Sequence, residues 1–260
     1  MIPKDLLLYL EGLPLPEVRF YAETGSTNQD ALDWAAQGAP ELALVVADHQ
    51  TAGRGRFSRQ WFTPPGAALA FSIVLRPVQV STAHIPLYSP LGALSVVQAL
   101  ENAYHLKPQI KWPNDVLLDD RKVCGVLAEA LWQGETLQAI VLGIGINVAP
   151  SSVPPADQIL FPATCVDEAV GRSINRWELL AEVLKVLLEW HGKITTSAFF
   201  AEWQKRLAFV GQMVRLENPG GDSFEGLLLG VHTNGHLRLQ LDDGSERSFA
   251  IGDLKLRPLS

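Results

Sequence analysis

Three runs of apolar residues, each about the length of one β-strand, place the strongest constraint on how this chain can fold. They cover residues 42–47, 68–75 and 139–148. Hydrophobic residues continue along each run instead of alternating with polar ones, which is typical of strands that are buried on both faces. The third run, AIVLGIGINV, contains two glycines, and glycine weakens a strand unless something must approach its backbone closely. The chain is therefore expected to contain a buried sheet with a point of close approach to its backbone.

Hydrophobic spacing predicts helices and further strands around these runs. Ser26 can cap a helix that stops at Gly38, and Gln29 is placed as in a capping box. The other expected elements are helices over residues 89–106, 176–191 and 197–207, strands over residues 109–112, 116–118 and 123–131, and a hairpin turn at Asp119-Asp120.

The spacing of apolar residues changes after residue 211. Short β-like runs at residues 213–216, 224–231, 237–241 and 247–251 alternate with turn-forming clusters at residues 218–222, 234–235 and 242–244. About fifty residues with this spacing are typical of a small antiparallel barrel of SH3-like size. We therefore expect a domain of residues 1–208 and a second domain of residues 209–260. The first is expected to be an α+β domain whose mixed sheet carries helices mostly on one face.

The overall composition argues against some classes of function. The formal net charge is −7, whereas a nucleic-acid-binding surface needs concentrated basic residues. The two cysteines, Cys124 and Cys165, form no CxxC pair, and the first residues lack the basic start and cleavage site of a signal peptide. No apolar stretch approaches the roughly 18 residues of a membrane span. A cytoplasmic protein with reduced cysteines and no membrane association is expected.

A polar loop, GRGRFSRQW at residues 53–61, separates the first two apolar runs. Its glycines, Gly53 and Gly55, allow the backbone to approach a ligand. Each arginine presents a planar set of donors that suits a carboxylate or a phosphate. The loop is interpreted as a clamp for a phosphate or an acyl phosphate. The alternative, for this segment alone, is a solvated hairpin loop whose charge has no function.

A second group of chemically useful residues follows the strand expected at residues 109–112. The sequence KWPND spans residues 111–115, and Arg121, Lys122 and Gly125 come soon after it. Lysine supplies a compact charge for a carbonyl or phosphoryl oxygen, Asn and Asp supply oxygen ligands, and glycine lets a ligand touch the backbone. Alone, these residues are also compatible with a hairpin that has a charged tip. Together with the arginine loop they indicate a site that activates a substrate with a nucleotide.

The two segments and their neighbours resemble the biotin protein ligases, the family that adenylates biotin and attaches it to a lysine of a carrier protein. The matching motifs follow the family's order, and the small C-terminal barrel extends the resemblance to nearly the whole chain. The matching segments are residues 26–28 (STN), 50–56 (QTAGRGR) with Trp61, 111–115 (KWPND), 121–122 (RK) with Gly125, and 143–147 (GIGIN). The resemblance implies a catalytic domain like those of class II synthetases, with an antiparallel-rich sheet.

The resemblance also implies roles for individual residues. Those expected to bind biotin, ATP or the adenylate are Ser26, Thr27, Asn28 and Gln50 at the ureido ring, Gly53, Arg54, Gly55 and Arg56 over the valerate and the phosphate, and Trp61, Asn114, Lys122, Gly125 and Asn147. Arg54, Lys111 and Lys122 are expected to offset negative charge during catalysis. Asp115 is expected to orient the attacking amine or to accept its proton. Mg²⁺ is expected to act with ATP, with Asn114 or Asn147 on the metal or phosphate side, and no set of protein ligands for a metal is identified.

The implied reaction has two steps. The biotin carboxylate attacks the α-phosphate of ATP, and the carrier's lysine then attacks the resulting mixed anhydride. The expected partner is the biotin carboxyl carrier protein of acetyl-CoA carboxylase or of a similar carboxylase, and a homodimer is a further hypothesis. The segment before residue 26 is expected to be too short for the winged helix-turn-helix of many family members, so binding of nucleic acid is not expected. Two alternatives remain open, a lipoate–protein ligase and a non-enzymatic anion-binding protein.

Overall fold

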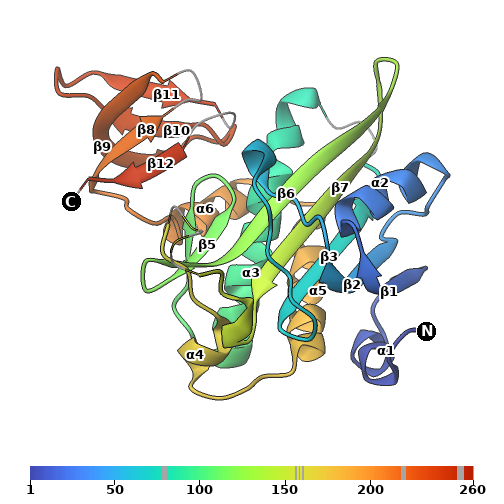
Figure 1. Cartoon of the computed structure of the whole chain (residues 1–260). Helices are drawn as coiled ribbons and strands as arrows, with labels where there is room; N and C mark the ends of the chain where they lie inside the picture. The colour runs from blue at the N-terminus through green and yellow to red at the C-terminus, as the bar shows by residue number, and fades with distance from the viewer. Residues whose placement is uncertain are drawn as a thin grey trace.

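The computed structural model describes residues 1–77, 81–155, 157, 159, 161–217, 221–250 and 255–259. Its largest unit is a seven-stranded sheet with the order β1-β2-β3-β7-β6-β5-β4 (Figure 1). The strands are β1 (Val18–Thr24), β2 (Leu44–Gln50), β3 (Ala68–Leu75), β4 (Gln109–Lys111), β5 (Asp115–Leu118), β6 (Arg121–Gln133) and β7 (Thr136–Asn147). β1 and β2 pair in parallel, whereas every other neighbouring pair of described strands in this sheet is antiparallel. The expected mixed, antiparallel-rich sheet is confirmed.

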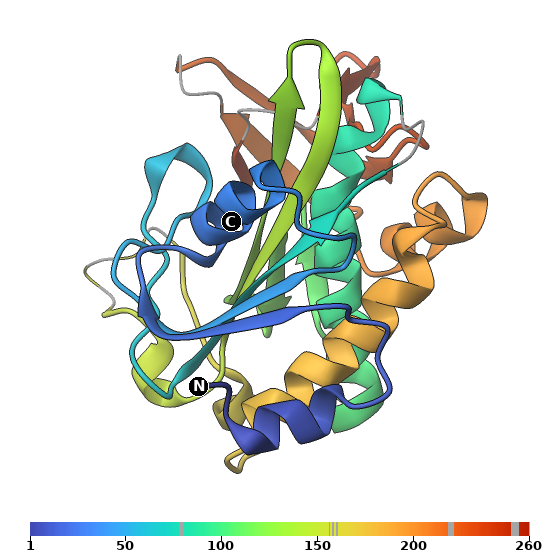
Figure 2. The same ribbon diagram turned by 90° about the vertical axis from the view of Figure 1, so that its right-hand side faces the viewer.

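Helices cover the two faces of this sheet unequally. α3 and α5 pack on one face, and α2 lies on the other (Figure 2). The helices are α1 (Lys4–Leu10), α2 (Thr27–Ala36), α3 (Tyr88–Tyr104), α4 (Val166–Val170), α5 (Arg176–His191) and α6 (Ser197–Lys205), with short 3₁₀ turns at Arg56–Ser58, Thr82–Leu87 and Pro150–Ser152. The prediction of helices mostly on one face is confirmed. α1 and β1 were not expected from the sequence, since their side chains are mostly exposed or only partly buried and show no clear period.

Alternation along β7 shows how the two faces differ. Every second residue from 140 to 146 belongs to the main core beneath α3 and α5. The residues between them face the α2 side, where Ala139 and Val141 pack against the helix. The next two positions on that side are Gly143 and Gly145, which line a cavity instead of packing beneath the helix. The α2 face of the sheet is therefore open where its strands carry glycine.

The C-terminal residues form a five-stranded antiparallel sheet with the order β11-β10-β9-β8-β12. Its strands are β8 (Met213–Glu217), β9 (Ser223–Val231), β10 (Leu237–Gln240), β11 (Glu246–Phe249) and β12 (Lys255–Pro258). The first four confirm the small SH3-like unit, although residues 218–220 and 251 of the expected pattern lie outside the described residues. β12 is an additional strand, whose single buried leucine, Leu256, is too short a pattern to predict it.

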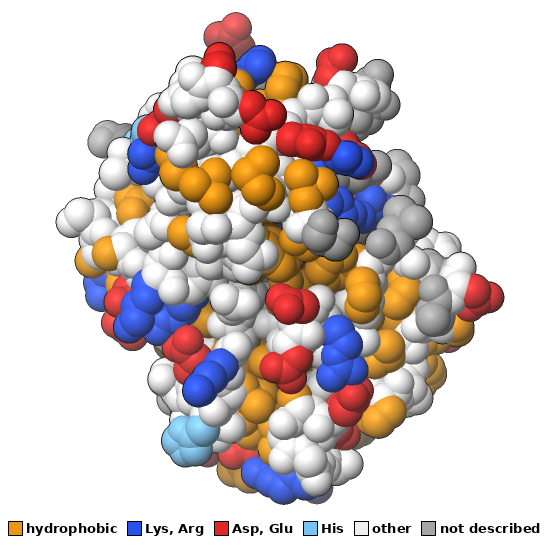
Figure 3. Space-filling view, turned by 90° about the vertical axis from the view of Figure 1, so that its left-hand side faces the viewer, with side chains coloured by type: hydrophobic (Ala, Val, Ile, Leu, Met, Phe, Trp, Pro, Cys, Tyr) orange, Lys and Arg blue, Asp and Glu red, His pale blue; other side chains and the backbone are white. Residues whose placement is uncertain are grey.

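The C-terminal sheet is tied to the large domain by hydrogen bonds from two places. The indole Nε1 of Trp112 donates to the carbonyl of Gly235 at 3.2 Å, and the amide of Val231 donates to Oε1 of Gln204 at 2.8 Å. The surface of the molecule carries mixed charge. On the face shown in Figure 3, acidic and basic side chains are interspersed, and apolar side chains lie between them. Among the described residues, no helix has the length and apolar character needed to cross a membrane.

Candidate functional site

A cavity of about 810 Å³ lies on the open part of the α2 face. Its volume falls in the range typical of small-molecule sites. Every residue that the sequence analysis assigns to the site lines this cavity: Ser26, Thr27, Asn28, Gln50, Gly53, Arg54, Gly55, Arg56, Trp61, Lys111, Asn114, Asp115, Lys122, Gly125 and Asn147. Segments that are far apart in the sequence thus form a single site, as the resemblance implies.

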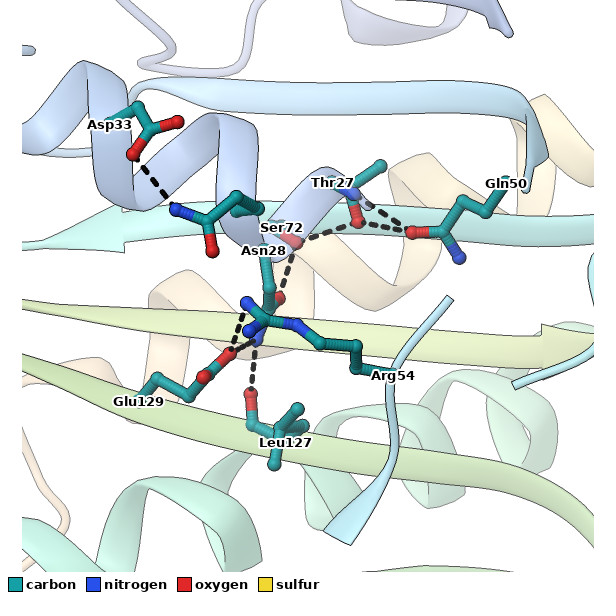
Figure 4. Close-up of polar contacts among 9 residues, drawn as sticks. Thr27, Asn28, Asp33, Gln50, Arg54, Ser72, Leu127 and Glu129 are labelled. Atoms are coloured by element: carbon teal, nitrogen blue, oxygen red, sulfur yellow. Dashed lines mark hydrogen bonds and ion pairs between the residues drawn. The ribbon is translucent and has the colours of Figure 1, made fainter. Parts of the chain in front are cut away.

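One end of the cavity is a network of uncharged polar groups around the start of α2. Oε1 of Gln50 accepts hydrogen bonds from the amide and the hydroxyl of Thr27, at 2.8 and 3.1 Å (Figure 4). Nε2 of Gln50 donates to the hydroxyl of Thr63 at 3.1 Å. Ser26 occupies the N-cap position, but within the described structure its side chain makes no capping hydrogen bond. The predicted helix start at Ser26 is confirmed, whereas the expected side-chain capping bond is not found among the described residues, and Ser26 lines the cavity.

Asn28 is held from several sides in the same network. Its Oδ1 accepts from the hydroxyl of Ser72 at 2.6 Å, and its Nδ2 donates to the carbonyl of Leu127 at 3.2 Å and to Oε2 of Glu129 at 2.7 Å (Figure 4). Both hydrogens of the amide are thereby used, whereas Oδ1 keeps one lone pair. Ser72 and Glu129 were missed by the sequence analysis, although a serine within the apolar run 68–75 is a visible signal.

Two glycines of β7 allow this packing. A Cβ atom added at Gly143 would overlap the side-chain amide of Asn28, and one added at Gly145 would overlap the ring of Trp61. Gly125, which pairs with Gly145 across β6 and β7, also lies against that ring. The close approach predicted from the glycines of residues 139–148 is confirmed, and the approaching groups are side chains of the site itself.

Trp61 lies against the sheet inside the cavity. Its ring contacts the backbone of the paired glycines, and Nζ of Lys122 lies 5.5 Å from the ring centroid. Nε1 of Trp61 is buried and has no hydrogen-bond partner among the described residues. This edge of the ring lies against Gly145, so the nitrogen is packed on the backbone of β7.

The other end of the cavity is cationic. Nζ of Lys122 donates to Oδ1 of Asp115 at 2.6 Å. Burial by itself would raise the pKa of the Asp115 carboxyl, but the charges of Lys122 and Lys111 outweigh burial and hold that pKa below its usual range. Burial lowers the pKa of Lys111 from 10.5 to about 7, although Asp115 opposes the shift. Nζ of Lys111 lies 3.9 Å from the ring centroid of Phe161.

Arg54 and Arg56 of the arginine loop lie at different ends of the cavity. Nη2 of Arg54 donates to Oε2 of Glu129 at 3.3 Å, beside Asn28 (Figure 4). Nη1 of Arg56 donates to Oδ1 of Asn114 at 3.1 Å, beside the cationic end. In this structure Arg54 is therefore placed with the uncharged network, and Arg56 is placed nearer to Lys122 in the cavity. The expectation that Arg54 acts together with Lys122 stays a prediction.

Phe161 and Arg257 also line the cationic end, and neither was predicted. Phe161 belongs to the segment that follows β7, and Arg257 belongs to β12 in the C-terminal sheet. The guanidinium carbon of Arg257 lies 5.5 Å from the ring centroid of Phe161. Burial and the nearby charge of Arg59 lower the pKa of Arg257. Neither residue could be found from its local sequence, because both reach the site only through the tertiary fold.

The donor set of the cavity fits a magnesium ion that arrives with phosphate oxygens. The described residues contain no group of three or more His, Cys, Asp or Glu that would hold a metal alone. Asp115, Asn114 and Asn147 present oxygen-bearing side chains to the cavity. Mg²⁺ is commonly bound through one or two protein oxygens together with substrate phosphates, and this cavity offers such oxygens.

Comparisons with known proteins agree with this arrangement. The sequence profile described as "Biotin/lipoate A/B protein ligase family" matches residues 21–147, and the profile described as "Biotin protein ligase C terminal domain" matches residues 209–257. The biotin–[acetyl-CoA-carboxylase] ligase of Paracoccus denitrificans is 34% identical over 84% of this chain and 92% of that protein. The bifunctional ligase/repressor BirA of Bacillus spizizenii is 33% identical over 89% of this chain and 71% of that protein.

Solved structures show the same relationship. The biotin protein ligase from Aquifex aeolicus, in complex with biotin and ATP, superposes with a TM-score of 0.81 at 29% sequence identity. The match covers 94% of this chain and 100% of that structure. The sequence relatives, the two matching profiles and the cavity lined by the predicted motifs lead to one conclusion. This chain belongs to the biotin protein ligase family.

Proposed function

We propose that this protein activates biotin with ATP as biotinyl-5′-AMP and transfers the biotin to a lysine of a carboxylase's biotinyl domain. The observation that carries the proposal is one cavity with two chemically different ends. The end around Thr27, Asn28 and Gln50 offers uncharged hydrogen-bonding groups, as a ureido ring requires. The end around Lys111 and Lys122 offers the positive charge that a carboxylate and a triphosphate require.

In the first step the carboxylate of biotin attacks the α-phosphorus of ATP. A new bond forms between the carboxylate oxygen and the phosphorus, and the bond to the bridging oxygen of the leaving pyrophosphate breaks. Two negatively charged groups must approach each other, so Lys122, Lys111 and Arg56 lower the barrier by offsetting their repulsion. Mg²⁺ would be held by the phosphates with oxygen from Asp115, Asn114 or Asn147, and would supply further charge compensation.

In the second step the lysine amine of the carrier attacks the acyl carbon of the mixed anhydride, an amide bond forms, and AMP leaves. The amine must be neutral when it attacks. Asp115 is ionised and fixed by Lys122, and is our candidate for the group that orients this amine or accepts its proton. The arginine loop, when it closes over the adenylate, would exclude water, which otherwise hydrolyses the anhydride.

A lipoate–protein ligase is the less favoured alternative. The dithiolane ring of lipoate has no N–H or carbonyl group. It would leave Asn28, Thr27 and Gln50 facing a group that cannot accept or donate a hydrogen bond. The hydrogen-bonding capacity that these groups keep beyond their contacts with one another would then go unused, so biotin fits this end of the cavity better.

Other parts of the assignment remain predictions. The domain boundary at residues 208 and 209 is supported by the positions of α6 and β8, which end at Lys205 and begin at Met213. A homodimer is proposed on the family resemblance, the absence of nucleic-acid binding on the net charge of −7, and a cytoplasmic location on the two cysteines that form no CxxC pair. β1 lies at an edge of the large sheet, where a second chain has backbone groups available for pairing.

The proposed activity is tested by isothermal titration with biotin, and with lipoate as the control, each with and without ATP and Mg²⁺. Mass spectrometry of the bound product follows, and then incubation with an isolated biotinyl domain. We expect biotin to bind, biotinyl-AMP to form and the domain to gain one biotin. Activation of lipoate instead would reject the substrate assignment, and binding of neither compound would reject the activity.

A further inference from the structure

We propose that Glu129 is a positioning residue, whose carboxylate fixes the acceptor atom of Asn28 and anchors the arginine loop over the same end of the cavity. The inference deepens the proposed function, on which it rests. Glu129 lies on β6. The described lining of the cavity includes Asn28, Arg54 and Leu127 but not Glu129, so Glu129 acts through its neighbours.

The side-chain amide of Asn28 has hydrogen-bond partners on both of its ends. Oε2 of Glu129 accepts from Nδ2 of Asn28 at 2.7 Å, and the carbonyl of Leu127 accepts from the same nitrogen at 3.2 Å. Because a carboxylate only accepts, it forces the nitrogen of the amide toward β6 and the oxygen toward the opposite side. The oxygen then lies near Ser72 with one lone pair unused. Glu129, together with the carbonyl of Leu127, thus fixes the orientation of the amide at this end of the cavity.

The same oxygen of Glu129 also contacts Arg54 of the arginine loop. Nη2 of Arg54 lies 3.3 Å from Oε2, and the two side chains are 41% and 28% exposed. Figure 4 shows Arg54 reaching from its loop across to β6, with Glu129 and Asn28 meeting at this point. One carboxylate oxygen therefore links the start of α2 with the loop. A pair at this exposure contributes modestly to folding, and it holds the side chain of Arg54 against β6.

The experiment separates the two contacts with two variants. Glu129→Gln keeps an acceptor for Nδ2 of Asn28 but removes the charge that attracts Arg54, whereas Glu129→Ala removes both. We expect the affinity for biotin to fall about tenfold in Glu129→Ala, which removes the acceptor for Nδ2 of Asn28, and by less than about threefold in Glu129→Gln, which keeps a neutral acceptor there and loses an exposed ion pair. Biotin affinity that is lost in Glu129→Ala but largely retained in Glu129→Gln distinguishes positioning from a general structural role. Thermal unfolding checks that both variants fold.

A readout that needs no substrate follows the loop itself. Trypsin cleaves after arginine, and residues 54–59 contain three arginines. With Arg54 released, we expect ligand-free Glu129→Gln to be cleaved within this loop roughly threefold faster than the unchanged protein, as an ion pair of this kind predicts. The matched control is Glu225→Gln, which removes a similarly exposed ion pair with Arg215 on the C-terminal sheet and should leave both readouts unchanged.

A double-variant cycle tests whether Glu129 acts through Arg54. Release of biotinyl-AMP, formed from biotin, ATP and Mg²⁺, is timed for Arg54→Ala, Glu129→Gln and the double variant. Non-additive effects, with the double variant no faster than Arg54→Ala, support the coupling, and additive effects overturn it. Unchanged affinity for biotin in Glu129→Ala would overturn the positioning of Asn28. If the unchanged protein itself fails to bind biotin, the proposed function is rejected and this inference with it, an outcome distinct from a failure of the variants alone.

Discussion

At the scale of single residues, the site depends on the lack of a side chain at Gly143 as much as on the side chains around it. Gly143 has no side chain, and the amide of Asn28 occupies the space that a Cβ atom would take. Asn28 cannot move away freely, because Ser72, Leu127 and Glu129 hold it on its other sides. The glycines of residues 139–148 mark a point of close approach in the sequence, and in the structure the approaching group at Gly143 is the side chain of Asn28.

We therefore expect Gly143→Ala to weaken biotin binding by about tenfold or more. The added methyl group displaces Asn28, and overpacking of this kind costs about 1–3 kcal/mol. Isothermal titration with biotin measures the effect. Gly192→Ala is the control, because a Cβ atom there meets nothing within 4 Å, and biotin affinity as strong in Gly143→Ala as in this control would contradict the role of Gly143.

Lys111 makes both stability and ATP binding depend on pH. Its pKa is lowered from 10.5 to about 7 in the folded protein, first by burial. Between these two values the unfolded chain binds more protons at this residue than the folded protein does, so the contribution to the free energy of unfolding rises with pH across that window. Below about pH 7 the buried charge is present and the destabilisation is complete.

ATP binding should raise the lowered pKa of Lys111 again, because the negative charge of the triphosphate favours the charged form of this side chain. We expect proton uptake when ATP binds just above neutral pH, and weaker ATP binding as the pH rises further. Titration calorimetry in two buffers with different ionisation enthalpies measures the uptake. Lys111→Gln should abolish it, and uptake that persists in this variant would assign the proton to another group.

At the scale of elements, the hairpin between β5 and β6 carries the lysine that pairs with Asp115. Its turn residues, Asp119 and Asp120, have φ values of 47° and 56°, as in the two-residue turns that join the strands of a hairpin. Two aspartates there identify a turn in the sequence, but they adopt the left-handed conformation at a cost. The predicted hairpin is confirmed.

Replacing the second turn residue should stabilise the protein without changing its activity. Glycine adopts positive φ without the steric cost, so Asp120→Gly is expected to raise the free energy of unfolding by about 0.5–1 kcal/mol. Urea unfolding and the rate of biotinyl-AMP formation are the two measurements. A loss of stability would show that the side chain of Asp120 contributes more than its backbone conformation costs.

At the scale of the whole molecule, the C-terminal sheet contributes to the site of the large domain. Arg257, on β12, lines the cationic end of the cavity and lies near Phe161. Its neighbour across the sheet is Arg215 on β8, which instead pairs with Glu225 at the surface. Two arginines at the same level of one sheet thus have different environments.

This difference provides a matched test. We expect Arg257→Ala to weaken ATP binding about tenfold, since it removes a cation from the phosphate end of the cavity, while biotin binding without ATP changes little. Arg215→Ala should leave both unchanged. Equal ATP affinities for the two variants would show that the C-terminal sheet does not act on the nucleotide.

Much of the fold and of the site followed from local patterns. Continuous apolar runs mark β2, β3 and β7 because buried strands must exclude polar side chains, and α3 and α5 follow the helical period for the same reason. The GRGR and KWPND segments carry their chemistry in adjacent residues, so their role could be interpreted before any contact was known. Every residue named from those motifs lines one cavity.

Tertiary structure alone decided which long-range partners complete the site. Glu129, Phe161 and Arg257 are unremarkable in their own segments, and each gains its role from a neighbour that is distant in sequence. The same holds for Arg54, whose partner is 75 residues away. Hydrophobic period reports whether a side chain is buried, but a hydrogen bond or an ion pair depends on register and direction across elements, which exist only once the sheet has formed.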